Sequence, residues 1–352
     1  MKVGVLTGGG DCPGLNSVIR AATKSLIADA GAEVIGIERG FLGLIERRCR
    51  PLGWHDVCGI HGRGGTILGT HNRADPFAYF GAGGADVSSA ALAYCAELGL
   101  DALVVIGGDG SMAIAERFAR LGLNIVGVPK TIDNDLFHND RSFGFDTAVA
   151  TVTDALGRLD TTGQSHGRVM ILETMGRYAG WIALEAGLAG GADVILLPER
   201  PYSVDVVAAR CREREARGKL SLICIAEGAA AAGASMTVAE RIEASPDPVR
   251  LGGVAHVLRR QLESQVASEV RATVLGHVQR GGAPTPFDRV LATQFGAQAA
   301  TMVCRAEFGR MVTVQGGVPG SVALADVAGR NRIVPLDHPL LASARQIGVC
   351  LG

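Results

Sequence analysis

The chain of 352 residues is 47% hydrophobic, and its 34 basic and 35 acidic residues give a formal net charge of −1. This length favours two domains, because a single hydrophobic core seldom grows beyond about 250–300 residues. The charge balance excludes a global basic field for nucleic acid or for a membrane surface. An anionic substrate would therefore have to be met by a local cluster of Arg and Lys.

The cysteines and the first residues of the chain both favour a location in the cytoplasm. The eight cysteines include no C-x-x-C pair, which favours a reduced chain in the cytoplasm. The opening residues, MKVGV, enter a strand-like run and lack the apolar core and cleavage site of a signal peptide. Apolar runs are broken well short of about 18 residues, so we expect no membrane span.

Short apolar runs alternate with helical patterns along the first part of the chain. Apolar residues recur at helical spacing over 15–26, and a further helix is expected to follow a glycine-rich turn and to end at Arg120. Strands are expected at residues 3–6, 33–37, 102–106 and 125–128.

The alternation restarts after Phe143, and the small residues of 228–235 predict a surface loop. Strands are expected at residues 169–172, 194–197, 222–225 and 272–275. Helices are expected at residues 149–159, 179–188, 203–217, 250–266 and 287–304.

Continuous apolar strands that alternate with helices are typical of parallel sheets covered on both faces. The two series therefore predict an α/β fold of two doubly wound, Rossmann-like domains with parallel-rich sheets and a cleft between them. In such sheets ligands bind beyond the carboxyl ends of the strands, so the residues that follow each strand should carry the chemistry.

Two glycine-rich turns follow predicted strands. The first, TGGGDCPGLN at residues 7–16, frees backbone N–H groups to face phosphate oxygens, although a purely structural turn would read the same. Pro13 occupies the place of the third glycine of a dinucleotide fingerprint, and the chain contains no P-loop motif. In the second turn, GGDGS, Asp109 is placed to hold Mg²⁺ and Gly110 leaves room for a nucleotide.

Three more segments combine acidic, hydroxyl and basic residues. PKTIDND at 129–135 follows a buried strand, and its carboxylates suit a general base in phosphoryl transfer, or simply an Asx-rich turn. ETMGRYAG at 173–180 and RATVLGHVQRGG at 271–282 place arginines and a histidine at strand ends, as an anion pocket requires.

In combination, eight stretches resemble the phosphofructokinase family: TGGGDCPGLN, GGTILG, GGDGS, PKTIDND, SHGR, ETMGRYAG, IAEG and RATVLGHVQRGG. They follow the family order from residue 3 to about 290, and together they are very specific. The resemblance implies a glycolytic kinase that uses Mg-ATP to phosphorylate the 1-hydroxyl of fructose 6-phosphate. It also implies a homodimer or homotetramer, because the family counterparts of Arg168 and Arg271 reach into a neighbouring subunit's site.

The resemblance further implies roles for single residues. Asp133 would be the general base, supported by Thr131 and Arg177, and Asp109 would position Mg²⁺. The donor-binding residues would be Gly10, Arg73, Gly108, Gly110, Ser111 and Lys130. The substrate-binding residues would be Thr131, Asp133, Asp135, Arg168, Met175, Gly176, Arg177, Glu227, Arg271, His277 and Arg280.

The expected phosphoryl-donor domain comprises residues 1–143 plus about 281–330, and the sugar-phosphate domain comprises 144–280 plus about 331–352. Arg20 and Lys24 resemble effector-site positions of the family, although solvated helix charges explain them more simply.

Two features depart from the family pattern. The common G-[ST]-x-R stretch reads GTHNR here, so either Arg73 reaches the donor phosphates after a one-residue insertion or Asn72 replaces the arginine; we favour Arg73. Gly110 resembles ATP users, whereas Lys130 resembles pyrophosphate users, and we favour ATP.

Other functions stay open at this point. They are a pyrophosphate-dependent phosphotransferase, the same chemistry on sedoheptulose 7-phosphate, and an inactive regulatory subunit, against which the presence of Asp109, Thr131, Asp133 and Arg177 argues. A Rossmann oxidoreductase is disfavoured by the missing fingerprint glycine.

Overall fold

The structure is a computed structural model, and it describes residues 1–241 and 249–352. Most strands belong to two sheets, which we call the large sheet and the small sheet. The strands of the large sheet are β1 (Lys2–Thr7), β2 (Glu33–Ile37), β3 (Cys49–Pro51), β4 (Ala102–Gly107), β5 (Ile125–Thr131), β6 (Phe143–Gly144), β13 (Arg310–Gln315) and β14 (Val318–Ala323).

The large sheet is mostly parallel. Its order is β14-β13-β5-β4-β1-β2-β3, and the short β6 pairs with the end of β5. Only the pairs β13–β14 and β2–β3 are antiparallel. The carboxyl ends of β1, β4 and β5 therefore meet along one edge.

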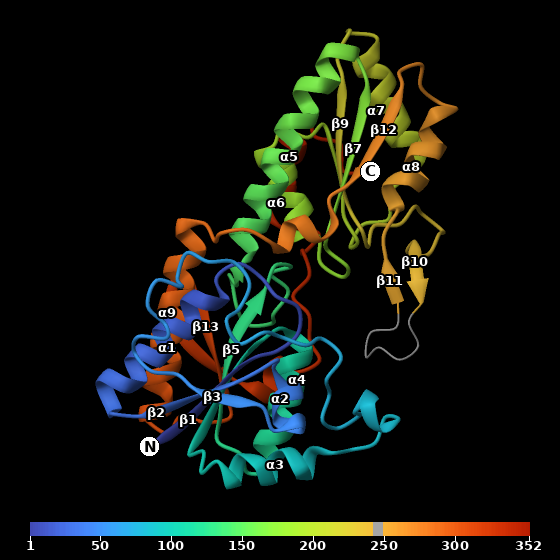
Figure 1. The fold of residues 1–352 in the computed structure, drawn as a ribbon. Helices are drawn as coiled ribbons and strands as arrows, with labels where there is room; N and C mark the ends of the chain where they lie inside the picture. The colour runs from blue at the N-terminus through green and yellow to red at the C-terminus, as the bar shows by residue number, and fades with distance from the viewer. Residues whose placement is uncertain (242–248) are drawn as a thin grey trace.

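The small sheet is parallel throughout, in the order β12-β7-β9-β8. In Figure 1 the small sheet lies above the large sheet, and a separate two-stranded ribbon lies to the right of them. The strands are β7 (Val169–Thr174), β8 (Val194–Leu196), β9 (Ser221–Ala226) and β12 (Val270–Val274), and the ribbon is β10 (Val238–Arg241) with β11 (Val249–Leu251).

Helices cover both faces of each sheet. They are α1 (Leu15–Ala30), α2 (Phe41–Glu46), α3 (Ser88–Glu97), α4 (Asp109–Arg120), α5 (Phe145–His166), α6 (Trp181–Ala189), α7 (Val204–Glu215), α8 (Val254–Glu263), α9 (Pro286–Cys304), α10 (Leu324–Val327) and α11 (Pro339–Gln346), with 3₁₀ turns η1 (Phe80–Ala82) and η2 (Gly276–Arg280).

Alternate residues of each strand enter different cores. In β4, Val104 packs in the cluster of α1 and α9, whereas Leu103 packs in the cluster of α2, α3 and α4. In β7, Leu172 packs with α5 and α6, whereas Ile171 packs with α7 and α8. The α1–α9 cluster and the α5–α6 cluster form one continuous core, which joins the two sheets.

The predicted α/β class with two parallel-rich sheets is confirmed, and every predicted strand and helix is present. The helix expected at 250–266 begins only at Val254, because Gly252 and Gly253 have φ values of 142° and 85°. β5 continues beyond Pro129, where we expected it to end, because Lys130 and Thr131 pair with β6.

Some elements were not predicted, among them α2, α3 and the β13–β14 hairpin. The domain boundaries stay a prediction: the large sheet takes its strands from residues 2–144 and 310–323, and the small sheet from 169–274. The predicted surface loop 228–235 is exposed only from Ala232 onward.

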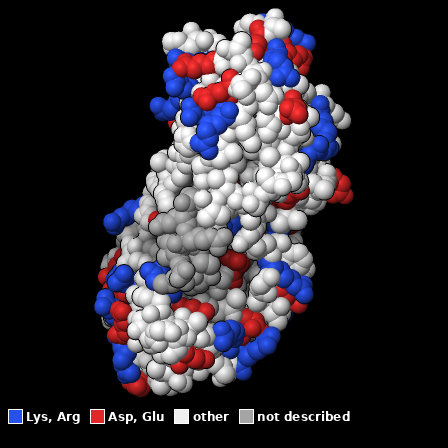
Figure 2. Space-filling model, turned by 90° about the vertical axis from the view of Figure 1, so that its right-hand side faces the viewer, with Lys and Arg blue, Asp and Glu red and all other residues white. Residues whose placement is uncertain are grey.

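The surface charges and the apolarity of the helices both agree with what the composition predicts. On the face shown in Figure 2, basic and acidic side chains are interspersed, so no large field of one sign appears there. Among the helices of residues 1–241 and 249–352, none combines the length and apolarity that a bilayer crossing needs.

The contact of α1 with α9 depends on one glycine. A Cβ at Gly296 would lie 2.6 Å from the carbonyl oxygen of Val18 and 2.9 Å from the backbone nitrogen of Ala22. We expect Gly296→Ala to lower the free energy of unfolding by about 1–3 kcal/mol, because the helices must separate. Urea denaturation measures this change.

Gly157 of α5 is the matched control, because a Cβ there would meet no atom within 4 Å. Gly157→Ala should leave stability unchanged or raise it by up to about 1 kcal/mol through helix propensity. Equal stability of Gly296→Ala and the wild type would show that the two helices do not need this close approach.

Candidate active site

A cavity of about 600 Å³ lies at the carboxyl ends of β1, β4 and β5. Its walls also include Arg177 and Tyr178, which follow β7, and Arg280, which ends η2 after β12. Both sheets thus contribute to one site, as expected for α/β sheets whose ligands bind beyond the strand ends. The predicted site residues that line the cavity are Gly10, Arg73, Gly108, Asp109, Gly110, Ser111, Lys130, Thr131, Asp133, Asp135, Arg177 and Arg280.

The two glycine-rich turns pack directly against each other. The backbone N–H of Gly8 donates to the carbonyl oxygen of Ile106 over 2.8 Å. A Cβ at Gly8 would lie 2.6 Å from the Oγ of Ser111 and 3.3 Å from its Cβ, so glycine at this position allows the close approach. Gly14 has a φ of 103° and begins α1 in a left-handed conformation. This packing leaves backbone groups of both turns at the cavity wall.

Three carboxylates share the cavity. Asp109 begins α4, and Asp133 and Asp135 follow β5. Burial, with the charge of Asp109, raises the pKa of Asp133, although Arg280, Lys130 and Arg177 oppose the shift. Burial and the charges of Asp133 and Asp109 raise the pKa of Asp135 to about 7. Such carboxylates accept a proton more readily than exposed ones do.

Thr131 orders the loop that holds these carboxylates. Its Oγ1 accepts a hydrogen bond of 3.0 Å from the backbone N–H of Asp133, an ST-turn that follows the strand. The Oδ1 atom of Asp133 is buried and has no hydrogen-bond partner among residues 1–241 and 249–352. Since a buried carboxylate oxygen is costly without a partner, this atom suits a substrate proton or a cation.

These carboxylates fit a divalent cation. Mg²⁺ is commonly held by one or two carboxylates together with substrate phosphates and water. Beyond the effect of burial, the charge of Asp109 raises the pKa of Asp133 and of Asp135, as an anionic group near a cation position does. Among the described residues no group of three or more acidic, His or Cys side chains is arranged to hold an ion by itself.

Lys130, Arg177 and Arg280 bring cationic groups to the cavity from three different segments. The Nζ of Lys130 donates to the carbonyl oxygen of Gly10, and burial lowers the pKa of this lysine. Nη1 of Arg280 donates over 3.2 Å to the carbonyl oxygen of Asp11. Arg177 stacks at 5.6 Å on the ring of Tyr178. Of the residues of the predicted anion pocket, Arg177 and Arg280 therefore lie at the cavity, beside Lys130.

The segment after Gly69 contains the two candidates for the place of the family arginine. Asn72 and Arg73 both line it. The guanidinium of Arg73 lies 4.8 Å from the ring centre of Phe80, and His71 stacks on the same ring at 5.3 Å. Burial and the charges of Arg39 and Arg73 lower the pKa of His71. The preference for Arg73 over Asn72 stays a prediction.

Three other predicted residues lie beside the cavity, at the carboxyl ends of β7 and β9. The backbone N–H of Met175 donates to Gln279, and that of Glu227 donates to Thr174. Burial and the charges of Asp133 and Glu173 raise the pKa of Glu227 to about 7. Gly176 has a φ of 129° and its carbonyl accepts from Gly228.

The structure does not bring His277, Arg168 and Arg271 into the cavity. His277 is exposed on η2. Arg168 precedes β7 and Arg271 lies near the start of β12, at the opposite end of the small sheet. Both arginines pair with Glu269. Within one chain these two arginines are remote from the carboxylates.

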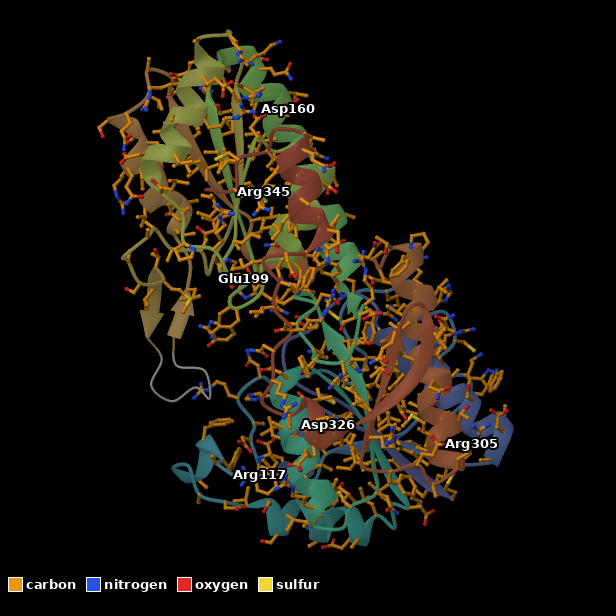
Figure 3. The ribbon with its side chains drawn as sticks, turned by 180° about the vertical axis from the view of Figure 1, so that it is seen from behind. Arg117, Asp160, Glu199, Arg305, Asp326 and Arg345 are labelled. Atoms are coloured by element: carbon orange, nitrogen blue, oxygen red, sulfur yellow. The ribbon has the colours of Figure 1, made fainter. Side chains whose placement is uncertain are left out.

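Sequence reasoning missed the far wall of the cavity, formed by Phe41, Ile114 and Arg117. Arg117, labelled in Figure 3, stacks on the ring of Phe77 at 3.6 Å. Gly110, Ile114 and Arg117 are spaced by four and three residues, which places them on one face of α4. That spacing could have revealed Ile114 and Arg117 once Gly110 was selected.

Comparison with known proteins agrees with this geometry. Residues 2–303 match the family model described as "Phosphofructokinase". The chain is 46% identical to "ATP-dependent 6-phosphofructokinase 2" of Clostridium perfringens, covering 99% of this chain and 97% of the relative. It is 47% identical to "Pyrophosphate--fructose 6-phosphate 1-phosphotransferase" of Amycolatopsis methanolica, covering 95% and 96%.

Solved structures show the same fold. Phosphofructokinase of Pichia pastoris in the T-state has a TM-score of 0.80 and 31% identity, covering 93% of this chain and 35% of that one. A pyrophosphate-dependent phosphofructokinase of Marinobacter aquaeolei has a TM-score of 0.80 at 20% identity, covering 100% and 89%. The chain belongs to the phosphofructokinase family and is a kinase with a hydroxyl acceptor.

Proposed function

We propose that this protein is a 6-phosphofructokinase of glycolysis, which transfers the γ-phosphoryl group of Mg-ATP to the 1-hydroxyl of fructose 6-phosphate. One observation carries the proposal: Asp109, Asp133 and Arg177, which follow three strands of two different sheets, line a single cavity. Phosphoryl transfer needs positioning and charge stabilisation more than covalent chemistry, and this cavity offers both.

In the proposed reaction, Asp133 accepts the proton of the 1-hydroxyl while the hydroxyl oxygen attacks the γ-phosphorus and ADP leaves. Thr131 holds the backbone of Asp133, and Arg177 offsets the charge on the transferring group. Asp109, with Asp135, would hold Mg²⁺, which when bound neutralises the donor phosphates. Met175, Gly176, Glu227, His277 and Arg280 would bind the sugar phosphate.

Two features of the cavity favour ATP over pyrophosphate. A Cβ at Gly110 would meet no atom within 4 Å, so the donor side is open there. The wall of Phe41, Ile114 and Arg117 extends the cavity with apolar and cationic surface, which a nucleoside would contact and pyrophosphate would not. Several relatives, at 43–48% identity, also carry ATP-dependent names. Donor-side residues would be Gly10, Arg73, Gly108, Gly110, Ser111 and Lys130.

The assembly and location of the enzyme are part of the same proposal. Arg271 is exposed, and with Arg168 it lies at the end of the small sheet remote from the cavity. We propose that in a homodimer or homotetramer these two arginines complete the sugar-phosphate site of a neighbouring subunit. We also propose that the enzyme acts in the cytoplasm.

The proposed function is tested by a coupled assay for fructose 1,6-bisphosphate with Mg²⁺ and either ATP or pyrophosphate. Sedoheptulose 7-phosphate serves as the alternative acceptor. Product with fructose 6-phosphate and ATP is expected. Faster turnover with pyrophosphate would reassign the donor, and no turnover with any pair would indicate a regulatory subunit.

Removal of the proposed base should slow the chemical step. We expect Asp133→Asn to lower kcat by about 10²–10⁴-fold, because an amide cannot accept the hydroxyl proton. Steady-state kinetics measures this loss. Asp326→Asn, an exposed change on α10 that Figure 3 labels, should leave kcat unchanged. Turnover of the Asp133 variant within a few-fold of the wild type would refute the assignment.

A carboxylate at position 110 should disfavour ATP. In Gly110→Asp, we expect kcat/KM for ATP to fall about tenfold or more, since about 1.4 kcal/mol of like-charge repulsion gives that factor. Gly110→Ala is the control for size, because the position has space for a methyl group. Equal losses in both variants would point to the added bulk at position 110 instead of charge.

The acidic limb of kcat/KM should have its midpoint near pH 7. The pKa of Asp135 is raised to about 7, so this carboxylate loses its charge, and with it its attraction for Mg²⁺, as the pH falls through that value. Asp135→Asn should move the limb, and a pH–rate profile at low substrate concentration measures it. An unchanged limb in that variant would assign the titration to another group.

A further inference from the structure

A short C-terminal segment, residues 331–334, contacts the loop that carries Asp133 and Asp135; we call it the strap. Asn331 forms an isolated β-bridge with Leu136. The backbone N–H of Arg332 donates to the carbonyl oxygen of Asp135 over 2.7 Å, and its Nη1 donates to that of Asn134 over 3.1 Å. The strap therefore holds the backbone between the two carboxylates and just after Asp135.

The same strap contacts the first residue of α6, which follows the loop of Arg177. The indole N–H of Trp181 donates to the carbonyl oxygen of Arg332 over 3.0 Å. The guanidinium of Arg332 lies 4.0 Å from the centre of the Trp181 ring. Trp181 is 2% exposed, so its position is set by packing. Arg332 thus contacts the proposed base loop on one side and α6 on the other.

Glu199 fastens the end of the strap. Its Oε1 accepts from the backbone N–H of Val334 over 2.7 Å and from that of Gly180 over 3.0 Å. Gly180 ends the segment that begins with Arg177 and precedes α6. Glu199 is labelled in Figure 3, between the two sheets. One carboxylate oxygen thereby links the strap to the Arg177 loop.

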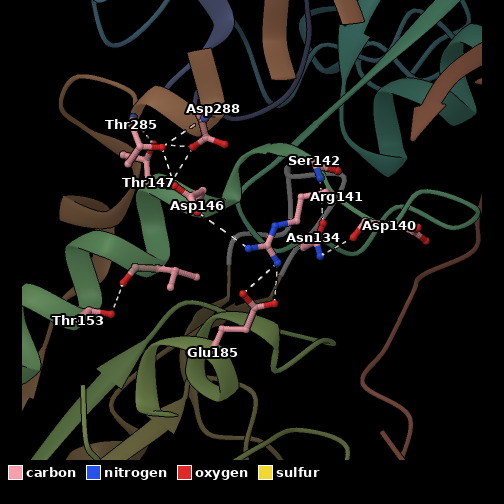
Figure 4. A network of polar contacts seen from close by, with 11 residues as sticks. Asn134, Asp140, Arg141, Ser142, Asp146, Thr147, Thr153, Glu185, Thr285 and Asp288 are labelled. Carbon is pink, nitrogen blue, oxygen red and sulfur yellow. Dashed lines mark hydrogen bonds and ion pairs between the residues drawn. The ribbon is translucent and has the colours of Figure 1, made fainter. Parts of the chain in front are cut away.

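A second tie reinforces the first. Nη1 of Arg141 donates to both carboxylate oxygens of Glu185, over 2.7 and 2.9 Å, as Figure 4 shows. Arg141 lies in the segment between β5 and β6, and Glu185 belongs to α6. Asn134 Oδ1 accepts from the backbone N–H of Ser142 over 2.9 Å, which ties this segment to the base loop. The base loop is therefore held against α6 at two places.

We propose that Arg332 is a positioning residue, which through the strap sets the base loop of Asp133 at the separation from the Arg177 loop that phosphoryl transfer requires. The proposal rests on the proposed function, and it adds a residue that lines no part of the cavity. Arg332 acts through its contacts with Asn134 and Trp181. It controls how Asp133 and Arg177 are aligned for the reaction. Misplacement of about 1 Å can cost about 10²-fold in rate.

The first test is Arg332→Ala, with Arg345→Ala on the exposed side of α11 as its matched control. We expect kcat of Arg332→Ala to fall about 10–100-fold, while KM for both substrates stays within about threefold, because most of the proposed donor- and sugar-binding groups lie on segments that Arg332 does not contact. Arg345→Ala should match the wild type. A kcat within twofold of the wild type, or a raised KM at normal kcat, would overturn the proposal.

Glu199 supplies an independent pair of variants if Arg332→Ala does not fold. Glu199→Ala removes the acceptor of Gly180 and Val334, so kcat should fall at nearly constant KM. Glu199→Gln keeps a carbonyl oxygen at the same place and should restore most of the lost kcat. A Gln variant as slow as the Ala variant would count against the strap.

Trp181 fluorescence tests the strap without any assay of activity. Trp54 and Trp181 are the two tryptophans, so Trp54→Phe leaves Trp181 as the only reporter. In that background, Arg332→Ala should shift the emission to longer wavelength and increase acrylamide quenching, whereas Arg345→Ala should not. Unchanged emission would overturn the strap contact. Absence of fructose 1,6-bisphosphate formation by the wild type would instead overturn the proposed function.

Discussion

The carboxylate cluster of Asp109, Asp133 and Asp135 is the constraint on which the cavity depends. Burial disfavours the charged form of Asp133 and Asp135, and the negative charge of Asp109 adds to this effect, so the pKa values of both carboxylates are raised. Lys130 and Arg280 lie close enough to act against the shift of Asp133. Neighbouring cations therefore favour the charged form of Asp133, and a bound divalent ion would act in the same direction.

The fold brings the carboxylates and cations together at the carboxyl ends of parallel strands. Parallel strands place their carboxyl ends on one edge, so the turns after β1, β4 and β5 meet without long loops. Arg177 and Arg280 follow strands of the small sheet. The apolar core that α5 and α6 share with α1 and α9 fixes the distance between the small sheet and the large sheet. A rigid core of this kind transmits changes of position, because close-packed interiors yield little.

Much of this arrangement could be predicted from the sequence, because it is local. β4 and β9 are buried on both faces, so their apolar runs mark them as strands of covered parallel sheets. Asp109 and Asp133 directly follow such strands. The β13–β14 hairpin also carries a local signal, since Gly316 and Gly317 both have positive φ in a two-residue turn. The flanking residues are less continuously apolar than those of β4 and β9, so the apolar pattern alone does not mark this hairpin.

The unpredicted part of the site consists of contacts between distant residues. Trp181 and Arg332 are 151 positions apart, and neither has a neighbouring motif that indicates the other. Residue type and spacing therefore identify groups that do chemistry at strand ends, whereas the groups that set distances between those ends emerge only from the packed chain. A kinase that relies on positioning places part of its catalytic control in such residues, far in sequence from its recognisable motifs.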